Sequence, residues 1–85
     1  KRGIVMNSLK LRRLAERIIK INRLNNKLYS NLGISVPKYI LDEIIDGGDK
    51  DNIIALIGLA KINDSILEED ARIFINNIDK YLLLK

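Results

Sequence analysis

The sequence predicts an all-α fold, a small four-helix domain in which a long basic N-terminal helix packs on three shorter helices. In four successive segments, apolar residues recur at every third or fourth position, which is the period of one helix face. Gly33, the pair Gly47 and Gly48, and the polar residues 63–65 separate these segments. No segment shows the strict alternation of a half-buried strand. With 85 residues, we expect the four helices to form one domain over 1–85.

The long helix is predicted over residues 8–31, after a short basic arm at 1–7. Asn7 or Ser8 supplies a suitable N-cap, and Gly33 follows the last turn. One side carries an apolar seam with alternating spacings of three and four residues: Leu11, Leu14, Ile18, Ile21, Asn25, Leu28 and Leu32. We expect the seam to pack against the chain's own helices. A parallel coiled-coil homodimer is the alternative, although no acidic residue flanks the seam to pair with its cations.

Two of the shorter helices are predicted over residues 36–46 and 66–84. Pro37 suits the first turn of the earlier one, because the N–H that proline lacks has no partner there. Ser65 and Glu68 match the capping box at the start of the later one, with a start one or two residues further on as the alternative. The side chains expected to point inward are Ile40, Leu41, Ile44 and Ile45 in the first, and Leu67, Ala71, Phe74, Ile78 and Tyr81 or Leu82 in the second.

The remaining helix is predicted over residues 52–62, capped by Asp49 or Asp51. It is apolar almost all round, which is typical of a helix buried at the centre of a domain. Gly58 lies in its interior, where glycine is less favourable than alanine by about 1 kcal/mol. We therefore expect Gly58 to permit a close crossing with another helix of the chain.

Composition excludes several classes of chemistry. Cysteine and histidine are absent, so disulfides, thiolate or imidazole metal sites and Ser-His or Cys-His catalysis are excluded. We expect a non-catalytic protein without metal or cofactor, located in the cytoplasm because it uses no cysteine. No apolar run approaches the roughly 18 residues that span a bilayer. Residues 1–9 also lack the apolar core of a secretory signal.

Acidic residues gather around Gly47 and Gly48, where they would suit a hard cation. Their spacing departs from the EF-hand pattern, and we expect them to cap helices and solvate the turn. The members are Asp42, Glu43, Asp46, Asp49 and Asp51. A helix-turn-helix formed by the last two helices is disfavoured, because the second of them opens with Glu68, Glu69 and Asp70, which would repel phosphates.

Basic residues concentrate at the other end of the chain. Residues 1–32 hold nine Lys and Arg against Glu16 alone, whereas residues 33–85 hold six against ten Asp and Glu. Such asymmetry indicates contact with an anionic partner at one end. On the long helix, Arg13, Lys20 and Lys27 recur every seven residues and form a nearly straight line. The predicted nucleic-acid-binding residues are Arg12, Arg13, Arg17, Lys20, Arg23 and Lys27.

Two functions are therefore predicted as alternatives. The first is a helical accessory subunit of a nucleic-acid-handling complex, which binds phosphates with weak sequence preference and docks a protein partner. The second is a protein–protein adaptor or oligomerisation module without nucleic-acid contact, in which the basic face is solvated or docked on acidic protein. Little aromatic character accompanies the basic residues, so stacking on bases is not expected to contribute.

Overall fold

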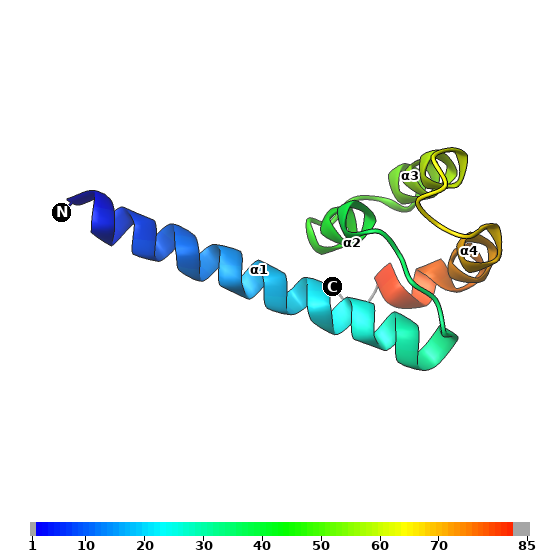
Figure 1. Ribbon diagram of the computed structural model, residues 1–85, viewed down its shortest axis with the longest axis horizontal. Helices are drawn as coiled ribbons and strands as arrows, with labels where there is room; N and C mark the ends of the chain where they lie inside the picture. Colours follow the sequence, from blue (N-terminus) through cyan, green and yellow to red (C-terminus); the bar gives the residue numbers. More distant parts are fainter. Residues whose placement is uncertain (1, 83–85) are drawn as a thin grey trace.

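The computed structural model describes the backbone of residues 2–82 and the side chains of residues 8–82. Within this range the chain forms four α-helices and no strand, which confirms the predicted all-α, four-helix fold (Figure 1). The helices are α1 (Arg2–Leu32), α2 (Lys38–Ile45), α3 (Lys50–Ile62) and α4 (Glu68–Leu82).

The first helix extends further toward the N-terminus than predicted. It begins at Arg2, so most of the predicted arm is helical, and Asn7 and Ser8 lie inside the helix rather than at its cap. Lys1 lies outside the described residues. At 1.5 Å per residue, 31 helical residues extend about 46 Å, close to the 50 Å length of the molecule. Because α2, α3 and α4 gather over its C-terminal half, the N-terminal half of α1 projects beyond them (Figure 1).

The core lies where the C-terminal half of α1 meets the other helices. Ile21, Leu24 and Leu28 point into it from α1. The predicted inward residues of α2 are confirmed, with Ile45 half-buried, and α4 contributes most of those predicted for it. Its four buried side chains are Ala71, Phe74, Ile78 and Tyr81. No polar or charged residue in the described part of the chain is buried.

The ends of the shorter helices follow from their capping residues. The side chain of Asp49 accepts a hydrogen bond from the backbone N–H of Asn52 at 2.9 Å, which confirms Asp49 as the cap of α3. Pro37 is the N-cap of α2 rather than part of its first turn, so α2 begins at Lys38, two residues later than predicted. Gly33 and Gly47 follow α1 and α2 with φ of +67° and +86°, values that glycine adopts without steric cost.

The start of α4 differs from the prediction. The helix begins at Glu68, two residues later than expected, and Leu67 is exposed. Because the helix begins at Glu68, its N-cap position is Leu67, and Ser65 lies two residues too early to cap it. The backbone N–H of Ser65 instead donates to the Ala60 carbonyl at 2.8 Å and closes the end of α3. The predicted residues 83 and 84 of this helix lie outside the described residues.

The prediction that α3 is buried at the centre of the domain is wrong. Ile53, Ile57 and Ala60 are buried, but Ala55, Leu59 and Ile62 are exposed on the other side of α3. The reason is that α2 and α4 cover only one side, and no further described helix lies beyond (Figure 1). The predicted close crossing at Gly58 is also wrong, since a Cβ added there would meet nothing within 4 Å.

Candidate interaction surfaces on the first helix

All six residues predicted to bind nucleic acid lie on α1, and five of them share one property. These five are exposed, and none forms an ion pair within the described part of the chain; they are Arg12, Arg13, Lys20, Arg23 and Lys27, hereafter the basic face. At 1.5 Å per residue, Arg13, Lys20 and Lys27 follow one another at intervals of about 10 Å along the helix. The basic face therefore presents a row of unneutralised cations.

The sixth residue, Arg17, is engaged by the rest of the domain. Its Nε donates to Oδ1 of Asp42 at 3.0 Å, and its Nη2 donates to Oδ2 of Asp46 at 2.6 Å. The hydrogen bond from Arg17 holds the pKa of the Asp46 carboxyl below its ordinary value. Arg17 therefore ties α1 to α2, and its charge is balanced by two carboxylates.

Sequence reasoning did not find this pairing, although a signal was present. Asp42 and Asp46 are four residues apart and lie on one side of α2. Arg17 lies on the side of α1 that faces α2, at the same edge as Ile21 and Leu24. The spacing of two acids on one helix and a cation beside the seam of its neighbour would have suggested an inter-helix ion pair.

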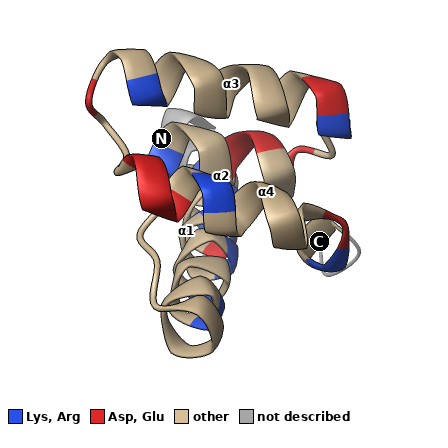
Figure 2. Ribbon diagram, turned by 90° about the vertical axis from the view of Figure 1, so that its right-hand side faces the viewer, with Lys and Arg blue, Asp and Glu red and all other residues tan. Residues whose placement is uncertain are grey.

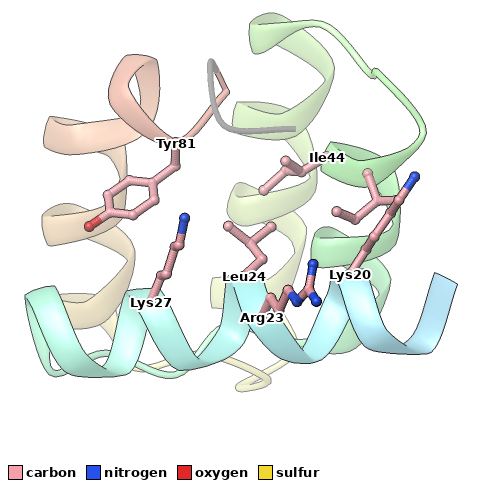
Figure 3. Close-up of a pocket in the computed structure, with 7 residues that line it drawn as sticks. Lys20, Arg23, Leu24, Lys27, Ile44 and Tyr81 are labelled. Atoms are coloured by element: carbon pink, nitrogen blue, oxygen red, sulfur yellow. The ribbon is translucent and has the colours of Figure 1, made fainter. Parts of the chain in front are cut away.

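A cavity of about 270 Å³ lies beside the basic face, between α1, α2 and α4. Lys20, Arg23 and Lys27 reach toward it from α1, and its apolar wall is formed by Leu24, Ile44, Ile45 and Tyr81 (Figure 3). No acidic residue is among the residues that line it. The arrangement places three cations around an apolar recess, which suits an anionic group better than a cation.

The apolar seam of α1 is divided into two parts. Ile21 and Leu28 are buried in the core, and Asn25 and Leu32 are half-buried. Three further members are exposed by 64%, 54% and 49%: Leu11, Leu14 and Ile18, hereafter the apolar stripe. The prediction that these three pack against the chain's own helices is wrong. Leu11 and Leu14 lie on the part of α1 that projects beyond α2, α3 and α4, whereas Ile18 lies at the edge of the contact with α2, beside Arg17, and is only partly covered.

Leu24 is buried in the core and Asn25 is only half-buried, although the heptad pattern placed Asn25 within the seam and Leu24 at its edge. The helix face that meets the domain runs through Arg17, Ile21, Leu24 and Leu28, rotated from the centre of the seam. The centre of the seam is therefore uncovered along the projecting part of α1.

The remaining chemistry of the chain is sparse. No group of three or more His, Cys, Asp or Glu that could hold a metal ion occurs among the described residues. None of the helices between residues 2 and 82 combines the length and apolar character needed to cross a membrane. Comparison with protein families, curated proteins and solved structures gave no match.

Proposed function

We propose that this chain is a non-catalytic protein-interaction module that docks a partner protein through the apolar stripe. The observation that carries this proposal is that Leu11, Leu14 and Ile18 are about half exposed or more, on a helix that projects beyond the domain. Three large apolar side chains at 3–4 spacing form the face by which one helix packs on another. Contiguous exposed apolar surface of this kind is typical of protein interaction sites.

The magnitude of the exposed surface supports the same function. Fully burying a leucine or isoleucine contributes about 1.5–3 kcal/mol, so covering the remaining half of each stripe residue adds roughly 1 kcal/mol per side chain. The three together offer a partner roughly 3 kcal/mol before the costs of association. The stripe is therefore the centre of a larger contact rather than a complete interface.

A capture experiment from the chain's native extract tests this function. The double variant Leu11→Gln, Leu14→Gln replaces two of the three stripe residues while preserving charge and helix propensity. Leu9 and Ile19 are similarly exposed on the same helix segment but lie on other sides of it, so Leu9→Gln, Ile19→Gln is the matched control. We expect a captured protein to be lost with the first variant and retained with the control. Identical capture by both variants would contradict the proposal.

A second function, binding to the phosphates of nucleic acid as an accessory subunit, is favoured by the basic face. Its five cations are exposed, and none has a carboxylate partner among the described residues. At 100° per residue, Arg13, Lys20 and Lys27 lie on the opposite side of α1 from the apolar stripe. One helix can therefore contact a protein and a phosphate backbone at the same time.

Salt dependence tests the second function. If five cations contact the phosphates of duplex DNA, log K falls with log salt at a slope of about −4.5. Replacing Arg13, Lys20 and Lys27 by Gln should reduce that slope by about 3. The matched control replaces three exposed lysines of the other helices by Gln, which gives the same net charge: Lys38, Lys61 and Lys80. Equal loss of binding in both triple variants would show a general effect of charge rather than a site.

A further inference from the structure

The molecule has a second uncovered apolar surface, on α3. Leu59 and Ile62 are exposed by 53% and 79%, and Ala55 lies one turn before Leu59 on the same side. This surface, hereafter the α3 face, points away from the buried residues Ile53 and Ile57. It therefore lies on the outside of the domain and is separate from the projecting half of α1 (Figure 1).

Gly58 gives the α3 face a feature that the fold of one copy does not explain. Glycine destabilises a helix interior relative to alanine. A Cβ at Gly58 would meet nothing within 4 Å, so packing inside the domain does not require its absence. A residue without a side chain, next to Ala55 and Leu59, leaves room for another helix to approach the α3 backbone closely.

The segments that carry the two apolar surfaces are opposite in charge. Residues 61–70, at the end of the α3 face and the start of α4, hold Lys61 and four acids, which are Asp64, Glu68, Glu69 and Asp70. In Figure 2 the first turn of α4 is red, and a short red segment lies in the turn between α3 and α4. Residues 8–20, which carry the apolar stripe, hold five Lys and Arg against Glu16 alone. Arg17 is paired with Asp42 and Asp46, and Arg13 and Lys20 lie on the far side of the helix, so the stripe lies on a segment that is basic as a whole rather than between cations. Opposite potentials of this kind orient two surfaces toward each other.

We propose that the partner docked by the apolar stripe is a second copy of this chain, and that the stripe packs on the α3 face of that copy. This inference rests on the proposed function, because it takes the stripe as a docking surface. The contact explains both uncovered apolar surfaces, the open space at Gly58 and the opposite charges with one arrangement. Because the two surfaces differ, the contact is head-to-tail, and in a dimer one copy keeps an unused α3 face while the other keeps an unused stripe. Assembly therefore continues beyond the dimer, or closes into a ring.

Sedimentation velocity of the purified full chain over a micromolar to millimolar series tests the inference. We expect the average mass of the unmodified chain to rise with concentration and to exceed that of a dimer. Two double variants are compared: a stripe variant, Leu11→Gln, Leu14→Gln, and an α3-face variant, Leu59→Gln, Ile62→Gln. Each should raise the dissociation constant more than about tenfold, since central apolar contacts dominate interfaces. Far-UV circular dichroism confirms that each variant remains folded.

Mixing the two variants gives the most specific result. Leu11→Gln, Leu14→Gln keeps an intact α3 face, and Leu59→Gln, Ile62→Gln keeps an intact stripe. An equimolar mixture should therefore form a one-to-one complex that grows no further. Raising the salt concentration should weaken it, because the attraction between the basic and acidic ends is screened. The control variant Leu9→Gln, Ile19→Gln should associate with the same dissociation constant as the unmodified chain.

Four results would overturn the inference. They are a monomer at every concentration, an absence of complex in the mixture, a control as defective as the stripe variant, and continued self-association of Leu59→Gln, Ile62→Gln. The last result would indicate symmetric pairing of two α1 stripes instead. If the chain stays monomeric but the stripe variant still loses a protein captured from native extract, the inference fails and the proposed function stands.

Discussion

Leu14 and Leu28 occupy equivalent positions in the heptad pattern, yet the structure predicts very different effects for the same substitution. Leu28 is 0% exposed and lies in the core, whereas Leu14 is 54% exposed on the projecting part of α1. Both lie in the interior of one helix, so leucine to alanine changes helix propensity equally at the two sites. The comparison isolates the effect of burial.

The expected magnitudes follow from the two environments. Leu28→Ala removes a fully buried side chain and should lower the free energy of unfolding by about 2–5 kcal/mol, the usual range for this change in a core. For a domain of this size, a loss of about 3 kcal/mol lowers Tm by roughly 12–24 °C. Leu14→Ala should change the free energy of unfolding by less than about 0.5 kcal/mol in the monomer, as exposed substitutions do.

Chemical and thermal denaturation followed by far-UV circular dichroism measures both effects. Dilute protein is required, because self-association through the apolar stripe would stabilise the folded state in a concentration-dependent way. A loss for Leu14→Ala that matches Leu28→Ala at high dilution would refute the reasoning, since it would mean that the stripe is buried within a single copy. A loss that appears only at high concentration would instead agree with docking by the stripe.

Three further substitutions test local features of the fold. Gly58→Ala should raise the free energy of unfolding by about 1 kcal/mol in dilute denaturation experiments, because a Cβ at this helical position meets nothing within 4 Å; a loss of stability would show that the space is filled. Asp64 has φ of +59°, so Asp64→Gly should relieve that conformation and raise the free energy of unfolding by about 0.5–1 kcal/mol, with a corresponding rise in Tm. An unchanged or lower Tm would contradict this. Arg17→Gln should destabilise the domain at neutral pH, and the pH dependence follows from the lowered pKa of Asp46. Because that pKa is lower in the folded state, the stabilisation is present above the carboxyl's ordinary value of 3.8 and is lost as the pH falls below it. Denaturation curves of the two proteins should therefore converge in acid, and a difference that persists there would contradict the assignment.

Local patterns were sufficient for the existence of the four helices and for some of their ends, although α1 begins earlier and α2 and α4 begin later than predicted. The positions of Gly33, Gly47 and Asp49 predicted where α1 and α2 end and where α3 is capped, because helix termination depends on backbone conformation and hydrogen bonds within a few residues. The inward faces of α2 and most of α4 were likewise predicted from their period, since each short helix has one clear apolar side. The exception is Leu67, which lies before the helix begins.

The candidate site was predicted in part. The basic residues of α1 were identified by charge, and five of them are exposed as a solvated or binding face requires. Arg17 has the same charge and a similar sequence position, but its role depends on Asp42 and Asp46, more than twenty residues away. Only the packing of α2 on α1 brings these three groups together.

By itself, the sequence determined the helical class, the number of helices and the separation of basic from acidic residues along the chain. Each of these depends on residue type and local spacing. The tertiary structure alone decided which apolar surfaces are covered, because coverage depends on how far α2, α3 and α4 reach along α1. They reach Ile21, Leu24 and Leu28 but leave Leu11, Leu14 and the outer side of α3 uncovered. Periodicity predicts that a helix has an apolar face, but only the arrangement of neighbouring helices decides whether the same chain covers it.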